Sequence, residues 1–382
     1  MSVEFKNARQ RAVAPFRADI VGSFLRPPVL KEARRKFQNE EISAEHLQKI
    51  EDAEIARLVE KQKAAGLQAV TDGEFRRSWW HLDFMWGLEG VEKRSIDQGY
   101  RFQGLETRAE TASLTGKIRF AGHPMLAHYQ FLHKVAGDTV SARQAIPAPA
   151  QLLAELQRGE NKAITDAVYD DTEELIADIA AAYRKAIQAF YAAGCRNLQL
   201  DDCTWGMLCD KAYWEARQQE GVDAAAIARL YARVNNEALR ERPADMVITM
   251  HVCRGNYHST WAASGGYEPV AGILFGTVKV DAFYLEFDTE RAGGFAPLRF
   301  IKDQQVVLGL ISSKSGELEN KADIIARLAE AVEYVPINQL CLSPQCGFAS
   351  TEEGNILTEE QQWAKLRLIK EIADQVWQES AV

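Results

Sequence analysis

Eight short apolar runs, separated by long amphipathic stretches, restrict the fold of this chain more than any other feature. Each run has the length and the apolar or β-branched content of a buried strand, and together they occupy residues 19–24, 68–75, 140–149, 197–202, 246–253, 282–287, 305–312 and 339–346. Strands that alternate with helices form parallel sheets. Eight such units close into a barrel whose active site lies where the strands end. The sequence therefore predicts an α/β protein with a (β/α)8 TIM-barrel fold.

The stretches between the runs have the periodicity of helices, with one exception. Residues 44–66 and 170–194 place apolar residues about every 3.6 positions and end on glycine, and residues 320–335 and 358–376 follow the last two runs. Residues 88–139 break this rhythm with glycine-punctuated, strand-like segments. We interpret them as a β-hairpin insertion between the second and third strands that covers the mouth of the barrel. Residues 1–382 then form a single catalytic domain.

The amino-acid composition and net charge exclude some classes of binding partner. The chain has 382 residues, 47% of them hydrophobic, and a formal net charge of −9. An acidic chain without a basic patch is not expected to bind nucleic acid. It shows neither the apolar core of a signal peptide nor a run near the ~20 residues of a membrane helix. Six cysteines in a chain of this size favour reduced thiols. We expect a cytoplasmic protein with small-molecule partners. The sequence is also compatible with a homo-oligomer.

Four residues at the ends of the later runs have the chemistry of metal ligands. His251 and Cys253 are two positions apart, so on a strand both side chains face the same side. Glu286 lies near the end of the sixth run, and Cys346 ends the eighth. Two thiolates, an imidazole and a carboxylate suit tetrahedral Zn²⁺, and the carboxylate is the easiest ligand to exchange for an incoming sulfur. From the spacing alone, ordinary burial of these side chains is an equally good interpretation.

The order of motifs along nearly the whole chain resembles the catalytic half of cobalamin-independent methionine synthases. VGSFLRP, TDGEF and LQLDD are similar to the first, second and fourth strands of that family. HVC, the glutamate of YLEF and the cysteine of SPQCGF follow the order of the family's zinc ligands. The resemblance implies a zinc-dependent methyltransferase that converts homocysteine to methionine, with 5-methyltetrahydrofolate, as the polyglutamate, for donor.

Such a reaction sets two chemical requirements. A free thiol with a pKa of ~8.5 is mostly protonated at neutral pH, so it must be converted to a thiolate. Direct coordination of the sulfur to zinc supplies the missing acidity. An acid near the leaving nitrogen must also activate an N-methyl donor.

Residues at the ends of the early runs are candidates for holding an amino-acid thiol. Gly22 and Ser23 offer a backbone N–H and a hydroxyl to a carboxylate, and Glu74 offers a partner to an ammonium group. Asp201 matches an aspartate in the family's substrate site, which implies a role in orienting the substrate and in catalysis. The alternatives are a turn or helix cap for Ser23 and ordinary ion pairs for the acids. Asp202 competes with Asp201, because strand alternation predicts that only one of them reaches the mouth.

Lys314 marks a departure from the family pattern. It stands where the family has a histidine that is a candidate for proton transfer, so the resemblance predicts a catalytic role for Lys314. A lysine at this place would bind an anionic group or act as an acid with a lowered pKa. A solvated surface lysine is the alternative. The DDCTW segment also replaces the family's DEPA-type continuation.

The donor is the least determined part of the reaction. Full-length family members carry a second barrel that helps bind the folate tail, and we expect none beside this one. A methyl-corrinoid protein or S-methylmethionine is therefore an alternative donor. Trp79, Trp80 and His81 are candidates to stack on a flat donor, with Arg76 and Arg77 for its carboxylates. An aromatic helix face packed under the insertion is an equally good interpretation.

Three other functions remain open. The first keeps the zinc but transfers the alkyl group to another small thiol, such as coenzyme M. The second is a metal-free barrel related to porphyrinogen decarboxylases, which would not need an H-x-C pair. The third is a non-enzymatic barrel with a structural zinc, which would favour thiolates over a carboxylate at the strand end.

Overall fold

Six parallel strands form the main sheet of the computed structural model, which describes residues 5–219 and 221–378. Their spatial order is β12 (Leu340–Pro344), β11 (Gln305–Ile311), β10 (Ala282–Glu286), β9 (Val247–Val252), β8 (Asn197–Asp202) and β7 (Gln144–Pro147). Almost every residue of these strands is buried, as expected for a parallel sheet that is covered on both faces.

Two further segments close the sheet into a ring. β1 (Ala69–Val70) pairs in parallel with β6 (Ser141–Ala142), which is separated from β7 only by Arg143. The segment at residues 18–23 then joins the two edges, because Ala18 bridges to Leu342 of β12 and Ser23 bridges to Gly73 after β1. The predicted (β/α)8 barrel is confirmed.

The early strands are less regular than the sequence predicts. Residues 19–24 form only isolated bridges, and the strand expected at 68–75 ends at Val70. The chain turns there, because Gly73 and Glu74 have φ angles of +67° and +62°. The left-handed region is unfavourable for a glutamate. The turn therefore holds Glu74 in a strained conformation at the mouth of the barrel.

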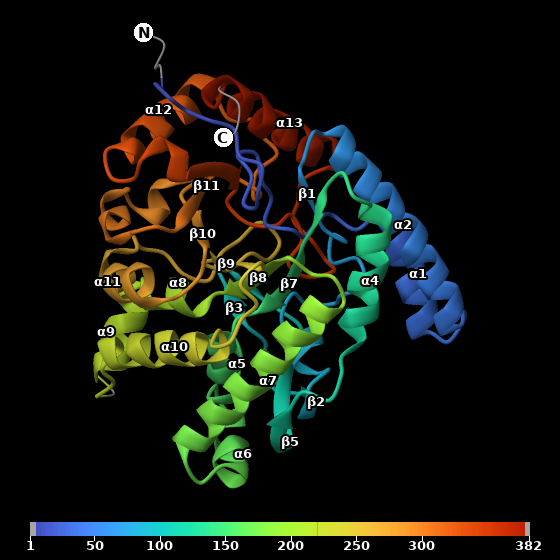
Figure 1. Ribbon diagram of the computed structural model, residues 1–382. Helices are drawn as coiled ribbons and strands as arrows, with labels where there is room; N and C mark the ends of the chain where they lie inside the picture. Colours follow the sequence, from blue (N-terminus) through green and yellow to red (C-terminus); the bar gives the residue numbers. More distant parts are fainter. Residues whose placement is uncertain (1–4, 220, 379–382) are drawn as a thin grey trace.

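Helices cover the outside of the ring (Figure 1). Ser43, Asp171 and Thr358 cap three long helices, which begin at residues 44, 172 and 359, with their side chains. None of the described helices has the length and apolar character that crossing a bilayer demands. In chain order the helices are α1 (Pro28–Gln38), α2 (Ala44–Ala64), α3 (Leu82–Met85), α4 (Pro124–Ala136), α5 (Pro149–Leu156), α6 (Asn161–Val168), α7 (Thr172–Ala192), α8 (Thr204–Leu208), α9 (Lys211–Gln219), α10 (Ala224–Ala238), α11 (Glu268–Thr277), α12 (Lys321–Val332) and α13 (Glu359–Val376), with the 3₁₀ turns η1 (Glu290–Ala292), η2 (Ala296–Phe300) and η3 (Ile337–Gln339).

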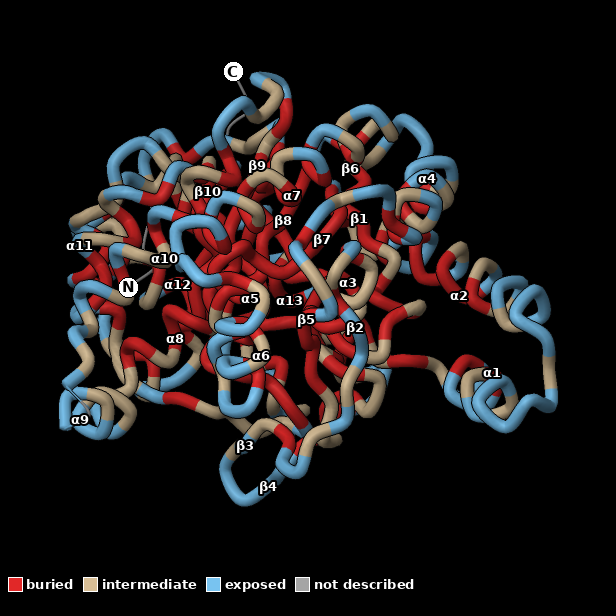
Figure 2. The backbone as a smooth tube through the Cα atoms, turned by 90° about the horizontal axis from the view of Figure 1, so that it is seen from below, coloured by how far each residue is buried: buried red, intermediate tan, exposed pale blue. Residues whose placement is uncertain are grey.

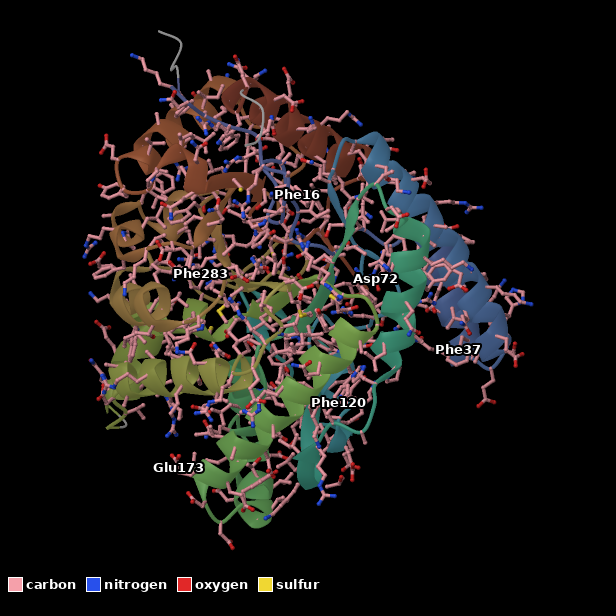
Figure 3. The ribbon with its side chains drawn as sticks, in the orientation of Figure 1. Phe16, Phe37, Asp72, Phe120, Glu173 and Phe283 are labelled. Carbon is pink, nitrogen blue, oxygen red and sulfur yellow. The ribbon has the colours of Figure 1, made fainter. Side chains whose placement is uncertain are left out.

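Apolar side chains fill the layer between the strands and the helices. Phe283 of β10 packs edge-on against Phe275 of α11, with ring centroids 5.2 Å apart. Figure 3 shows Phe283 within the body of the molecule and Phe37 of α1 at its outer edge. Burial of such side chains supplies most of the stability of the barrel.

The predicted hairpin lies between the second and third barrel strands. β2 (Glu89–Ser95) pairs antiparallel with β5 (Glu110–Arg119), and β3 (Arg101–Phe102) pairs with β4 (Leu105–Glu106) at the tip. The outer side of the tip is exposed (Figure 2). The backbone N–H of Gln103 donates to the Trp261 carbonyl at 3.1 Å, which fixes the tip to the loop after β9. The range 88–139 also contains α4, which packs beside α2 and α7 as a barrel helix.

A buried ion pair lies inside the barrel. The guanidinium of Arg143 pairs with the Asp19 carboxylate, and both side chains are fully buried. Asp19 also accepts hydrogen bonds from the N–H groups of Phe16 and Ile20, at 2.8 and 2.7 Å. Arg143 lies over the ring of Tyr284 at 5.1 Å. Every charge in this interior network therefore has a partner.

Candidate metal centre and substrate cavity

A cavity of about 570 Å³ lies where the barrel strands end. Its wall includes residues that follow β8, β9 and β12, together with Tyr100 and Phe102 from the tip of the hairpin. The carboxyl ends of the strands are where barrel enzymes place their active sites. The insertion therefore forms part of the cavity wall.

Three residues in this wall form a compact group of metal-ligand atoms. The ligand atoms of His251, Cys253 and Cys346 all lie within 4.8 Å of one another, and the three residues are buried. The two sulfur atoms are 3.5 Å apart, close to the about 3.8 Å expected for two sulfurs on a tetrahedral zinc ion. Neither ring nitrogen of His251 has a hydrogen-bond partner. A buried imidazole without a partner is costly, so these residues fit a bound metal and can hold one.

The register of the parallel strands creates this group. His251 lies opposite Asp201 of β8, and the N–H of Cys253 donates to the Asp202 carbonyl at 2.9 Å. Gly206 allows α8 to approach, because a Cβ atom there would lie 2.1 Å from the Cys253 carbonyl oxygen. The N–H of Gly255 points at the Cys253 sulfur at 3.2 Å, which favours a thiolate at that position.

Glu286, the fourth predicted ligand, lies at the end of β10, but its carboxylate has other partners. One oxygen forms an ion pair with Arg291, and the other accepts the backbone N–H of Arg254 at 3.0 Å. The side chain is completely buried. No oxygen of Glu286 belongs to the compact group of ligand atoms.

Cys203 is a cavity residue that the sequence analysis does not single out. It follows β8 directly, and the register of β8 and β9 places it beside Cys253. A hydrogen bond with Cys253, together with burial, raises the pKa of the Cys203 thiol well above its usual value. The signal in the sequence was its position one residue after the LQLDD strand, in line with Cys253 on the next strand.

Glu74 and Asp201 place two carboxyl groups in the same cavity wall. Burial raises the pKa of Glu74 to about 7, against the opposing charges of Arg77 and Arg26. One Glu74 oxygen is buried without a partner. Burial raises the pKa of Asp201 to about 6, although Gln199 donates to it at 2.8 Å. A cationic ligand would stabilise the ionised form of both carboxyl groups.

Gly22 and Ser23 hold the loop that follows the first barrel segment. The carbonyl of Gly22 accepts the Thr71 hydroxyl at 2.5 Å. Ser23 lines the cavity, and its hydroxyl oxygen accepts the N–H of Ala349 at 3.2 Å. Gly347 passes so close that a Cβ atom would lie 1.9 Å from that oxygen. Ser23 therefore ties the first segment to the loop that carries Cys346, and its hydroxyl proton stays available to a ligand.

Lys314 and Asp202 differ from the sequence expectation. Lys314 does not border the cavity; its ammonium donates to the Gly255 carbonyl at 3.1 Å and the Asn256 amide oxygen at 3.0 Å. Asp202 does border the cavity, as Asp201 does, so the prediction that only one would reach it is wrong. Asp202 is the last residue of β8, and its carboxylate accepts the N–H of Thr204, the first residue of α8, at 2.6 Å.

Aromatic residues form the outer wall of the cavity. The rings of Trp80 and His81 stack at 4.4 Å, and the Nε2 atom of His81 lies 3.0 Å from the Tyr100 hydroxyl. Trp79 also borders the cavity and is almost fully buried.

Arg76 and Arg77 do not border this cavity. Arg76 forms ion pairs with Glu51 and Asp52. Arg77 donates to the Ala145 carbonyl at 2.5 Å. These arginines therefore support the loop rather than a ligand.

The family model and the similar proteins of known name agree on one family for this chain. The family model described as "Cobalamin-independent synthase, Catalytic domain" matches residues 16–375. The uncharacterized protein YxjH of Bacillus subtilis (strain 168) is 52% identical over 374 residues, which is 97% of each chain. A solved structure of a putative vitamin-B12 independent methionine synthase from Listeria monocytogenes is 45% identical, with a TM-score of 0.76 over 96% of this chain and 99% of that one. The methionine synthase of Saccharolobus solfataricus is 24% identical over 86% of each chain.

Proposed function

The chain belongs to the cobalamin-independent methionine synthase family and is a methyltransferase of that kind, and we propose that it methylates the thiol of homocysteine with the help of zinc. The buried group of His251, Cys253 and Cys346 is the observation that carries this proposal. When bound, zinc would keep the acceptor sulfur as a thiolate at neutral pH. Glu286 is proposed as the exchangeable fourth ligand. The need for reduced thiols favours the cytoplasm.

The other cavity residues suit the two ends of an amino acid. Glu74 and Asp201 are buried carboxyl groups that a substrate ammonium would ionise and pair with, since a nearby cation lowers a carboxyl pKa. Ser23 offers a hydroxyl proton to the substrate carboxylate, and Gly22 positions Ser23 through its hydrogen bond with Thr71. Asp201 lies opposite His251 in register, so it also orients the substrate near the metal ligands.

The aromatic outer wall supports a flat donor, and we propose 5-methyltetrahydrofolate. Trp80 and Tyr100 line a cavity of about 570 Å³, which suits a small molecule. Methyl transfer assayed with 5-methyltetrahydrofolate, S-methylmethionine or methylcobalamin, with homocysteine or coenzyme M as acceptor, separates the alternatives. Activity with a corrinoid alone would contradict the folate donor.

The ligand assignment can be tested by metal content. Cys346→Ser should lose stoichiometric zinc, because a serine hydroxyl is a much poorer zinc ligand than a thiolate. Cys341→Ser is the matched control, since Cys341 is a buried cysteine of β12 whose sulfur lies 3.8 Å from the Pro15 carbonyl, outside the compact group. Stoichiometric zinc retained in Cys346→Ser would remove this residue from the ligand set.

Zinc-edge X-ray absorption tests the acceptor. Addition of homocysteine should raise the number of sulfur neighbours from two to three, as an added thiolate requires. An unchanged shell would point to another thiol or to a structural metal. Absence of zinc after careful reconstitution would favour a metal-free barrel.

A further inference from the structure

The partners of Glu286 suggest what happens to its carboxylate when a thiol occupies the metal. Both carboxylate oxygens are already bonded, one to the Arg291 guanidinium and one to the Arg254 N–H at 3.0 Å. The side chain has no exposure to solvent. Each carboxylate oxygen keeps a second lone pair, so these bonds alone do not exclude a metal, but the guanidinium charge beside the carboxylate opposes the approach of a cation. The structure therefore shows an arginine-bound position for the carboxylate that the proposed function treats as a ligand.

Arg291 is itself held in place. Its side chain is only 10% exposed, and its guanidinium lies over the Trp261 ring at 5.0 Å. It also approaches the Asp288 carboxylate at 3.6 Å. The backbone carbonyl of Arg291 accepts the N–H of Gly265 at 2.9 Å. A fixed guanidinium loses little conformational freedom when it binds a carboxylate, so it is a ready partner for Glu286.

We propose that Arg291 is a positioning residue that holds the Glu286 carboxylate away from the metal and so opens a coordination place for the acceptor thiolate. This inference rests on the proposed function. A charge-assisted bond to a guanidinium offsets the negative charge of the carboxylate, and so weakens its attraction for a metal ion. Arg291 therefore weakens metal binding by the resting site and strengthens binding of the thiol. Linkage requires these two effects to be coupled.

The positioning role predicts that removal of Arg291 raises the affinity for zinc and lowers the affinity for homocysteine, whereas a structural role predicts no such opposite changes. Arg291→Met removes the charge and keeps an unbranched, flexible side chain. The freed Glu286 should then hold zinc about tenfold more tightly, and homocysteine should bind about tenfold more weakly. A purely structural loss would weaken both. Arg291→Lys should restore part of both affinities, because lysine keeps the charge without the planar fork.

The experiment uses the full zinc-loaded chain. Transfer of zinc to a chromophoric chelator, without any thiol, gives the metal affinity, and a titration with homocysteine followed by zinc-edge absorption gives the thiol affinity. Arg299→Met is the matched control, because Arg299 forms an exposed ion pair with Glu268. This control should change neither affinity.

A double-mutant cycle shows whether Arg291 acts through Glu286. Arg291→Met should have no further effect on zinc transfer in a Glu286→Ala background. A persistent effect there, or unchanged zinc affinity in Arg291→Met alone, overturns the positioning role. A parent chain that fails to bind zinc at all would instead overturn the proposed function, so the two failures are distinguishable.

Discussion

The interior of the barrel and its mouth both bury charged groups, but they treat them in opposite ways. Inside, Arg143 and Asp19 are fully buried and every bond is satisfied. At the mouth, His251 has two unpartnered ring nitrogens, and one oxygen each of Glu74 and Asp202 is buried without a partner. Burying an unpaired polar group costs stability. The difference indicates that the interior charges stabilise the fold, whereas the unpartnered groups at the mouth are available to bind ligands.

The strongest test of this comparison removes one interior charge. Arg143→Met should leave the Asp19 carboxylate buried without its partner and lower the free energy of unfolding by about 3–5 kcal/mol. Denaturant unfolding monitored by circular dichroism measures this. Arg233→Met is the control, since the Arg233–Glu173 pair is exposed and should matter by about 1 kcal/mol or less. Equal losses in the two variants would refute the distinction.

A mouth charge should respond with the opposite sign. Glu74→Gln removes a carboxylate whose ionised form is penalised by burial. The free energy of unfolding at pH 8 should rise by about 2 kcal/mol, while homocysteine binding weakens. The same unfolding experiments and a thiol titration measure both effects. A destabilised Glu74→Gln would show that Glu74 supports the fold.

The pH dependence of stability sharpens the same point. The pKa of Glu74 is raised to about 7 from its ordinary value near 4.5, so the folded protein keeps this proton at pH values where the unfolded chain has released it. This contribution to stability is complete below about pH 4.5 and is lost as the pH rises to about 7. The unfolding free energy of the parent, minus that of Glu74→Gln, should fall by at most about 1.4 kcal/mol per pH unit as the pH rises through this window. A flat difference would contradict the raised pKa.

The smallest expected effect is at Lys314, which contacts the loop after β9 at the mouth. Lys314→Met removes two hydrogen bonds to the chain just after Cys253, so the free energy of unfolding should fall by about 1 kcal/mol. Turnover should fall much more than zinc content, because these bonds position the loop that follows the ligands. Lys321→Met, which breaks a pair with Glu371 near the surface, is the control. Unchanged turnover in Lys314→Met would exclude it from the mechanism.

The sequence predicts the regular part of the fold well. The apolar run at 305–312 matches β11 to within one residue, because a strand buried on both faces leaves a nearly uninterrupted apolar signal. The first barrel segment is harder to predict, since its residues pair only through isolated bridges. In the run at 68–75, the strand ends already at Val70, and the chain turns through the left-handed Gly73 and Glu74. Such a conformation has no clear signature in side-chain polarity.

The site divides in a similar way. The grouping of His251, Cys253 and Cys346 follows from strand alternation and the barrel order. The position of the Glu286 carboxylate does not, because its partner Arg291 lies in a 3₁₀ turn without a periodic pattern. The bonds of Lys314 depend on a loop conformation that local sequence does not specify.

The position of the hairpin tip affects how the donor specificity of such an enzyme can change during evolution. The inner end of the cavity is made from barrel strands, where a substitution disturbs the core, but residues 100–107 lie on a peripheral insertion that contributes Tyr100 and Phe102 to the wall. Surface loops accept change far more readily than packed strands. We expect relatives to exchange one methyl donor for another by altering this tip, while the thiol-binding end is inherited unchanged.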